Sequence, residues 1–473
     1  MSRSDHADAA FAGTKNSVGR ATTRELPEDA AAPASAVAPG WFLALAVVFA
    51  GLAAAMTLTP YPPLQDFLEW AYQGKLLALL VTGADLGSIR IAPYPVPNSM
   101  TQVIMGLLSL VLPARLAALV FLLGFLAAAS WVARALARRY QPLVAGPLSL
   151  VLLVSIFVAA PFWSGYSNYV FSLLLFGIFL LIPRERWTGV STVLVFSVAI
   201  FFTHLTTFAS FLLLVGVNAM VRRRIWPVLL GVLPSVLLAC WYYVALDRGR
   251  LDPGVPLVGQ AQGNILADLA KFVAYKVYTF AKVGPYHNFV FAAGGDVVVR
   301  PAIYWAGVLL NCAYALVLML MLVLGGWDAV RRKSVTVVPV IAGILMALVF
   351  LLMPPGRLVA NTGERFMYPA LLLLLLFLPL RLRLAQALGA AAVLLLLGLV
   401  ALTSAQQDWA TGLPEADWEA PQRVLFQHRP TAFAGAWHAM EELGAGKPAD
   451  PPQLSFETSL LISDRLGAPP ARP

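Results

Sequence analysis

Apolar runs of roughly 15 to 24 residues recur along most of this 473-residue chain, and they limit the folds it can adopt. A helix needs about 20 such residues to cross the hydrocarbon core of a membrane. Apolar residues make up 59% of the sequence and charged ones 12%, which is about half the charged share of soluble domains. One large soluble core would leave most of these runs without the polar face that soluble helices carry. The sequence therefore predicts an all-α membrane protein, built as a polytopic helical bundle.

The positive charges orient the predicted helices. Segment 1–40 is polar, carries four basic residues and lacks the pattern of a cleavable signal peptide, so we expect a disordered cytoplasmic tail. The first span, 41–58, then runs outward, and most basic clusters between later spans fall inside. This arrangement accounts for the net charge of +9 without nucleic acid as a partner. We expect about eleven transmembrane helices within 41–402 and an extracytoplasmic tail over 403–473.

Several segments depart from a simple crossing. Segment 67–82 is expected to be an amphipathic helix along the outer membrane surface, and so is 264–283. Segment 99–112 is too short to cross and is predicted to be a re-entrant or surface helix. Segment 143–160 is expected to cross outward as one helix. The run 189–220 is too long for one span, and we split it at His204, which places this residue at an outer turn.

The two cysteines, Cys240 and Cys312, both fall inside apolar runs. They do not indicate a disulfide framework, and we expect both to be buried apolar side chains.

The first outer loop carries two acids, Asp66 and Glu69, directly after three prolines. Residues three apart share a face of a helix, and the prolines stiffen the entry to it. Such a pair can serve as a general base with a partner, or as metal ligands. The alternative is a solvated acidic pair on a surface helix.

Two arginines, Arg357 and Arg365, lie in a later outer loop, against the topological bias of basic residues. A guanidinium offers a planar fork of donors that fits a phosphate, so we assign phosphate binding to one of them. The alternatives are snorkelling at the membrane boundary or an ion pair with Glu364.

Further polar and aromatic residues are expected on the same outer face. His204, set within an apolar run, can donate to a phosphate or accept from a substrate hydroxyl; the alternative is a packing histidine. The aromatic residues can stack on a sugar, or belong to the belt that lines membrane boundaries. The full set assigned to substrate binding beside the arginines is His204, Asn98, Trp163, Tyr166, Asn168 and Tyr169.

The sequence shows no motif for nucleotide-dependent, zinc-dependent or serine-hydrolase chemistry. The sequence has no Walker loop, dinucleotide fingerprint, zinc spacing or nucleophile elbow, so ATP or NAD chemistry is not expected. The predicted spans hold almost no charge at mid-depth, where pumps and ion carriers place ionisable residues. There is also no internal repeat of the kind that transporters often show.

Short motifs at these positions resemble the GT-C superfamily of membrane glycosyltransferases, in particular its poorly characterised bacterial members. They are Pro-Leu-Gln-Asp-Phe-Leu-Glu at 63–69, Pro-Val-Pro-Asn at 95–98, Gly-Tyr-Ser-Asn-Tyr at 165–169, His-Leu-Thr-Thr at 204–207 and Glu-Arg-Phe at 364–366. The resemblance implies a sugar donor on a polyprenyl phosphate. It also implies that Asp66 deprotonates the acceptor hydroxyl or binds a metal, and that Arg357 or Arg365 holds the donor phosphate.

The resulting hypothesis is an inverting glycosyltransferase in the bacterial cytoplasmic (inner) membrane, with its N-terminus inside and its C-terminus outside. Asp66 and Glu69 are its catalytic candidates. A divalent cation, Mg²⁺ or Mn²⁺, is one option as cofactor, with the same two acids as ligands. Its partners would be a polyprenyl-phosphate-linked sugar, a glycan, lipid or protein acceptor, and membrane lipid. The alternatives are a lipid or polysaccharide transporter (a flippase) and a non-catalytic membrane assembly subunit.

Overall fold

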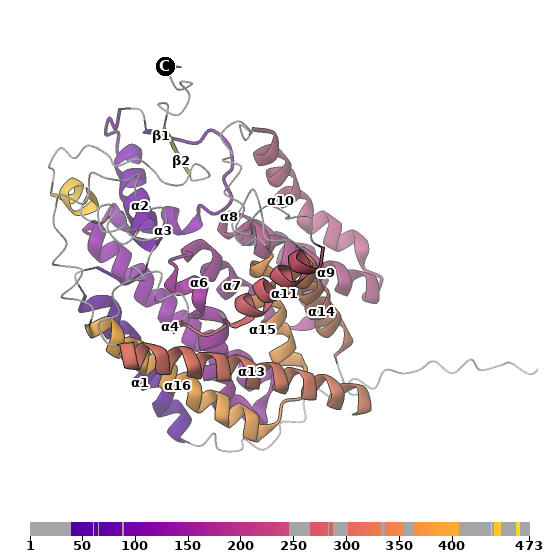
Figure 1. The fold of residues 1–473 in the computed structure, drawn as a ribbon. Helices are drawn as coiled ribbons and strands as arrows, with labels where there is room; N and C mark the ends of the chain where they lie inside the picture. The colour runs from indigo at the N-terminus through magenta and orange to yellow at the C-terminus, as the bar shows by residue number, and fades with distance from the viewer. Residues whose placement is uncertain are drawn as a thin grey trace, which may run out of the picture. The chain divides into compact units, whose positions relative to one another are not determined.

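The computed structural model describes residues 39–59, 61–64, 66–87, 89–245, 265–281, 283–286, 301–332, 336–353, 363–405, 437, 439–445 and 460–463. This part of the chain is mostly helical, as Figure 1 shows, and is consistent with the predicted all-α membrane protein. The predicted tail 1–40 lies outside the described residues except for its last two positions. The same holds for most of the predicted tail 403–473.

Six helices in the described ranges are long and apolar enough to cross a membrane. They are α1 (Pro39–Thr57), α4 (Ala114–Tyr140), α9 (Leu205–Arg222), α10 (Ile225–Ala245), α13 (Pro301–Arg332) and α16 (Leu382–Ala405). The other expected spans correspond to shorter helices, namely α5 (Ala145–Leu152), α7 (Ser167–Leu180), α8 (Val190–Thr203), α14 (Val337–Leu352) and α15 (Met367–Phe377). Six crossings are therefore supported by length and composition, and a total of about eleven stays a prediction.

Segment 143–160 forms a continuous but irregular helix that ends at Phe157, and it is too short to be among the six crossing candidates. It begins as a 3₁₀ turn, η1 (Pro142–Val144), continues as α5 and ends as a π-helical stretch, η2 (Leu153–Phe157). The short helix α6 (Ala160–Trp163) follows. Every residue from Leu148 to Phe157 is buried. A segment that is apolar all round and covered by protein needs no regular lipid-facing surface, so hydropathy does not reveal the change of helix type or the end at Phe157.

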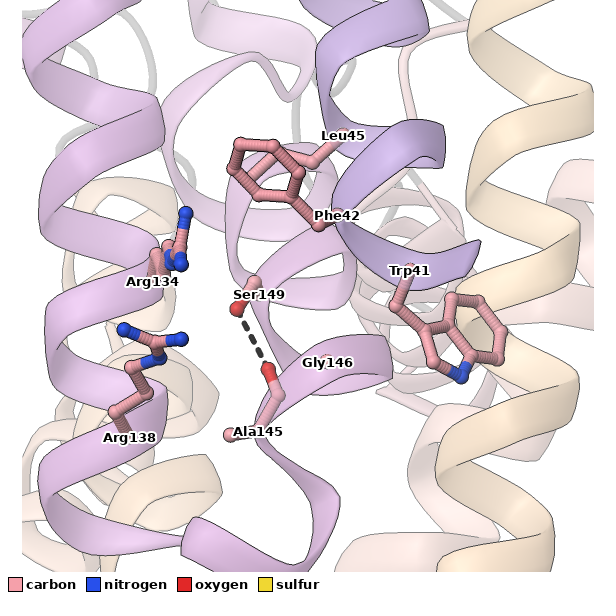
Figure 2. Close-up of a pocket in the computed structure, with 8 residues that line it drawn as sticks. All are labelled: Trp41, Phe42, Leu45, Arg134, Arg138, Ala145, Gly146 and Ser149. Atoms are coloured by element: carbon pink, nitrogen blue, oxygen red, sulfur yellow. Dashed lines mark hydrogen bonds between the residues drawn. The ribbon is translucent and has the colours of Figure 1, made fainter. Parts of the chain in front are cut away.

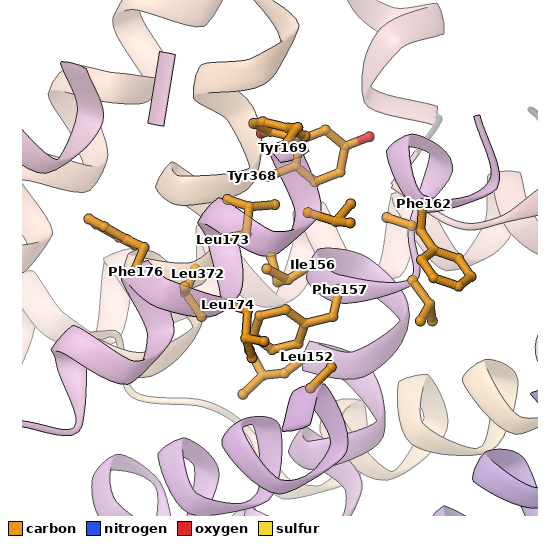
Figure 3. Close-up of a cluster of buried hydrophobic side chains, with 14 of the residues drawn as sticks. Leu152, Ile156, Phe157, Phe162, Tyr169, Leu173, Leu174, Phe176, Tyr368 and Leu372 are labelled. Carbon is orange, nitrogen blue, oxygen red and sulfur yellow. The ribbon is translucent and has the colours of Figure 1, made fainter. Parts of the chain in front are cut away.

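The core of the molecule forms around this irregular helix, 142–157. Figure 3 shows Ile156 and Phe157 among side chains of α7 and α15, including Leu173 and Leu372. α4 and α16 also pack on α5. The irregular helix and its neighbours therefore form one continuous apolar centre, and the polar residues considered below lie on the segments that extend from it.

The predicted split of 189–220 at His204 is confirmed. α8 ends at Thr203, α9 begins at Leu205, and His204 between them has extended backbone at φ −165° and ψ 124°. α8 packs on α9 and on α10. On the α10 side, a side chain at Gly231 would meet Val193 Cβ at 2.8 Å, so this glycine allows the close crossing.

Helix α2 (Phe67–Val81) matches the predicted boundaries, but protein covers it on most sides. It packs on α3 (Met100–Ser109), where Gly74 and Gly106 let the two backbones approach. A Cβ at Gly74 would lie 2.9 Å from Met105 Cβ. The predicted surface helix is therefore covered by protein over most of its length, in part because α3 packs on it.

A short ribbon joins two distant segments. β1 (Ile89–Ile91) pairs antiparallel with β2 (Leu461–Ser463), with Arg90 opposite Ile462. Arg115 also forms an ion pair with Glu441 at 3.2 Å. The described parts of the C-terminal segment therefore lie beside the loop after α2 and the start of α4, in keeping with a tail on the same side as the first loop.

Two further expectations are resolved. The predicted surface helix at 264–283 is present as α11 (Ile265–Ala281). Cys240 and Cys312 were expected to be buried, and this is wrong: both lie on exposed faces of α10 and α13. Apolar helices that face lipid expose apolar side chains, so an apolar run alone does not predict burial within the protein.

Candidate functional site

The two acids of the first loop are buried at the start of α2. Asp66 is 7% exposed and Glu69 is 4% exposed, which excludes a solvated acidic pair. The backbone N–H of Asp66 donates to the Ser164 carbonyl at 3.0 Å, and its carbonyl accepts from Trp70 as α2 begins. Glu69 accepts a hydrogen bond from Gln73 Nε2 at 3.2 Å, one helical turn further on. The backbone of Asp66 and the carboxyl of Glu69 are therefore held at defined positions.

A glycine turn fixes the position of Asp66 from the other side. Gly165 has φ +75°, and a Cβ there would lie 2.4 Å from Asp66 N and 2.3 Å from Phe67 N. Only glycine fits such a contact, because it tolerates positive φ and has no side chain. The predicted turn at 165–169 is therefore in direct backbone contact with the predicted acidic motif, although about 100 positions separate them.

Asn168 joins this turn to the predicted Asn98 motif. Its Oδ1 accepts from Thr101 N at 3.0 Å, and its Nδ2 donates to the Asn98 carbonyl at 2.8 Å and to Gln102 Oε1 at 2.9 Å. Asn98 has φ +65°, a conformation that asparagine adopts more readily than most residues. Asn168 is thus committed to the protein, whereas Oδ1 of Asn98 is buried without a hydrogen-bond partner.

His204 and Arg365 form a direct pair. Nη1 of Arg365 lies 2.9 Å from Nε2 of His204, and Tyr169 donates its hydroxyl to the Arg365 carbonyl at 2.6 Å. The guanidinium also lies over two rings, with Cζ 5.3 Å from the Tyr166 centroid and 5.8 Å from that of Tyr169. Tyr169 meets the His204 ring edge-on at 4.8 Å between centroids. Four of the predicted site residues therefore form one cluster.

The protonation of this pair follows from the chemistry of its partners. A guanidinium has only donors, so Nε2 of His204 must accept, and the neutral ring carries its proton on Nδ1. Burial lowers the pKa of His204 well below its usual value, and the neighbouring Arg365 charge lowers it further. Nδ1 of His204 and Nε of Arg365 are both buried without a hydrogen-bond partner. The pair therefore holds two buried N–H donors that no acceptor in the structure satisfies.

Helix α11 is attached beside Arg365. Tyr275 and Thr279 both donate to Oε1 of Glu364, at 2.5 and 3.1 Å. Lys276 donates to the carbonyls of Phe350 and Met353 at the end of α14, at 2.6 and 2.7 Å. α11 thus contacts the residue that precedes Arg365, and burial lowers the pKa of Lys276.

The remaining predicted residues are placed differently. Trp163 is fully buried, and its indole N–H donates to the Val158 carbonyl at 2.9 Å, so it offers no surface for a sugar in this conformation. Tyr166 is half-buried under Arg365. Arg357 lies outside the described residues. In the parts of the chain that are described, no group of three His, Cys, Asp or Glu residues is arranged to hold a metal ion.

Several contributors to this region were not singled out from the sequence. Gln73 and Gln102 bond the site residues directly, and Thr279 bonds Glu364. For Gln73 a signal exists, since a Gln four positions after a Glu lies on the same helix face. For Gln102 and Thr279 no local pattern marks the contact, because it depends on segments far apart in the chain.

A small apolar hollow lies between the loop before α2 and the helices α4, α6 and α7. It has a volume of about 10 Å³ and is lined by Leu64, Phe121, Leu122, Phe125, Phe162, Ser167 and Val170. The hollow is too small for a substrate, and its lining is almost entirely apolar.

The described part of the chain is helical, with six helices long and apolar enough to cross a membrane, and is consistent with a helical membrane protein. Around the turn 164–166 and the start of α7 lie the backbone of Asp66, the His204–Arg365 pair and two tyrosine rings. No family model matches the chain, and no curated protein or solved structure matches it either.

Proposed function

We propose that this protein is a membrane glycosyltransferase that moves a sugar from a polyprenyl-phosphate donor to an acceptor on the extracytoplasmic face. One observation carries the proposal: the His204–Arg365 pair, with two buried and unpartnered N–H donors, contacts Tyr166 and Tyr169, and the adjacent Gly165 contacts the backbone of Asp66. Transfer from a phosphosugar needs a base near the acceptor and positive charge near the leaving phosphate. The cluster supplies both residue types within one region.

In this mechanism Asp66 takes the proton of the acceptor hydroxyl. The acceptor oxygen attacks the anomeric carbon as the bond from that carbon to the phosphate oxygen breaks, so the configuration inverts. Arg365 stabilises the phosphate that leaves, and the Nδ1–H of His204 donates to one of its oxygens. Glu69, held by Gln73, is the second acid beside the reaction. The half-buried ring of Tyr166 offers a face on which a sugar can stack.

The positions of buried charge favour an enzyme over a transporter. In the described part of the chain, the buried acidic and basic side chains are Asp66, Glu69 and Lys276. Two of these lie at the start of α2, and the third bonds the end of α14 beside Glu364. A flippase is expected to line a polar path between both faces. Buried charge that is confined to the start of α2 and the end of α14 therefore fits an enzyme acting at one membrane surface better than a flippase.

The test is transfer from polyprenyl-phosphate-linked sugars in proteoliposomes, read as release of free polyprenyl phosphate. Asp66→Asn is expected to lower the rate by about 10²- to 10⁴-fold while the protein inserts and purifies normally. Full activity in Asp66→Asn removes the base assignment. If the wild type translocates the lipid without releasing polyprenyl phosphate, the protein is a transporter. If it does neither, in the presence of a full donor panel, the assembly-subunit alternative gains support.

A further inference from the structure

A second cationic site lies where the start of α1 meets the end of α4, at the ends of these helices that are far from Asp66. A cavity of about 210 Å³ opens there between α1, α4 and α5. Figure 2 shows Arg134 and Arg138 on α4 turned toward it, with Phe42 and Leu45 of α1 opposite and Gly146 and Ser149 of α5 behind. α1 contains 19 residues, or about 28 Å of helix, between this end and the loop that leads to Asp66. The cavity is therefore remote from the candidate active site.

The two arginines of this cavity have no acidic partner among the described residues. They lie four positions apart on α4, so their side chains stand one above the other on a single face. Arg134 lies over the Phe42 ring, with Cζ 4.6 Å from the centroid, while Arg138 is exposed. Two adjacent, uncompensated guanidinium groups repel each other, and a shared anion would relieve this repulsion.

The apolar side of the cavity is closely packed. A Cβ at Gly146 would lie 2.9 Å from Trp41, and one at Gly389 would lie 3.0 Å from the same ring. The two glycines thus let Trp41 sit tightly between α5 and α16. The hydroxyl of Ser149 is bonded to the Ala145 carbonyl at 2.6 Å. The lining therefore combines a fixed apolar wall with a cationic one.

This combination matches one end of a phospholipid. The length of α1 is close to the thickness of the hydrocarbon core, so a cavity at its end lies at the level of lipid phosphates. A planar guanidinium fork fits phosphate oxygens, while Phe42 and Leu45 can contact the upper acyl chain. A soluble phosphate would use the arginines but gain nothing from the apolar wall. We propose that this cavity binds the phosphodiester headgroup of an anionic phospholipid, independently of the proposed glycosyl transfer.

The proposal is tested by lipid retention on the purified full-length protein. Native mass spectrometry would compare phosphatidylglycerol with phosphatidylcholine on three proteins: wild type, Arg134→Gln/Arg138→Gln, and the control Arg222→Gln/Arg224→Gln. The control removes two exposed arginines from another basic cluster outside this cavity. We expect wild type and control to retain phosphatidylglycerol preferentially. The cavity variant should bind it about tenfold more weakly or worse.

Three outcomes would overturn the proposal: equal retention of both lipids, equal loss in both double variants, or displacement of phosphatidylglycerol by millimolar inorganic phosphate. The last would identify a site for free phosphate rather than lipid. Should the double variant fail to fold, Arg138→Gln alone serves, because that side chain is exposed and its removal leaves the packing of α4 intact. It is expected to show a smaller loss in the same direction, and retention equal to wild type would count against the lipid site.

Discussion

Nη1 of Arg365 lies 2.9 Å from Nε2 of His204, and this contact joins two residues 161 positions apart. It requires a neutral histidine, because a guanidinium donates and the ring nitrogen must accept. The contact leaves Nδ1 of His204 and Nε of Arg365 as buried donors without partners. A buried donor without a partner destabilises the folded protein. An oxyanion bound here would accept from both donors, which would remove this penalty and stabilise the bound anion.

His204 predicts a pH dependence of stability. Its pKa lies well below 6.5 in the folded protein because of burial and the Arg365 charge, whereas in the unfolded chain it is near 6.5. Below that pH the unfolded state binds more protons, so stability falls as pH falls. The loss approaches about 1.4 kcal/mol per pH unit until the folded pKa is reached.

The measurement is thermal unfolding in detergent between pH 8 and 5, for wild type and His204→Gln. Wild type should lose more stability than the variant on acidification below 6.5, and the two should run parallel above it. Identical pH profiles would show that His204 is not neutral and buried in the folded protein.

Arg365 is expected to dominate phosphate affinity. Arg365→Gln should weaken binding of undecaprenyl phosphate by about tenfold to 100-fold, the worth of a charge-assisted hydrogen bond. Arg365→Lys should recover only part of the loss, because an ammonium lacks the planar fork. Isothermal titration in nanodiscs measures these affinities. Arg381→Gln is the control, since that arginine pairs with Asp328 on the surface, and equal losses in both Gln variants would contradict a specific role for Arg365.

Gly165 tests whether the turn positions Asp66. Gly165→Ala places a Cβ 2.4 Å from Asp66 N at positive φ, so we expect a loss of about 2 kcal/mol or more and reduced transfer. Gly124→Ala is matched to it, since that helical glycine has nothing within 4 Å of the added atom. The control should be neutral or slightly stabilised by helix propensity. Differential scanning fluorimetry compares them, and wild-type stability in Gly165→Ala would show that the turn does not contact Asp66.

Tyr275 tests the attachment of α11. Tyr275→Phe removes the 2.5 Å hydrogen bond to Glu364, a loss of about 1.5 to 3 kcal/mol for a bond to a charged acceptor. We expect faster hydrogen exchange in 265–281, with α14 unchanged. Val277→Ala, at an exposed position of the same helix, is the control. Unaltered exchange in Tyr275→Phe would mean that the Tyr275–Glu364 hydrogen bond does not hold α11 in place, and that Thr279, Lys276 and the packing on α13 suffice.

Patterns local in the chain predicted much of the fold. The helix break at His204 followed from a run too long for one span, and α11 from its mixed polar and apolar residues. Burial was harder, because hydropathy does not distinguish a helix that faces lipid from one that faces protein. For that reason Cys240 and Cys312 were expected to be buried, and α2 was expected to lie on the surface, where Gly74 in fact packs against α3.

The site shows the same division. The sequence predicted that residues of five segments lie in one region. The contacts of Asp66, Asn98, Asn168, His204 and Arg365 do bring these five segments together. Individual roles were not predictable. The side-chain amide of Asn168 forms hydrogen bonds with Thr101, Asn98 and Gln102. The indole N–H of Trp163 donates to the Val158 carbonyl. These hydrogen bonds depend on which backbone groups the fold leaves unpaired, and no local sequence motif encodes that.

The central claim, that Arg365, His204 and Asp66 form one phosphosugar site, is tested most directly by an experimental structure of the protein in nanodiscs with undecaprenyl phosphate. The account predicts the phosphate within about 3 Å of the Arg365 guanidinium and in hydrogen-bond reach of His204 Nδ1, with the Asp66 carboxyl facing the same cavity. A phosphate bound elsewhere, or Asp66 and Arg365 opening onto separate cavities, would contradict it.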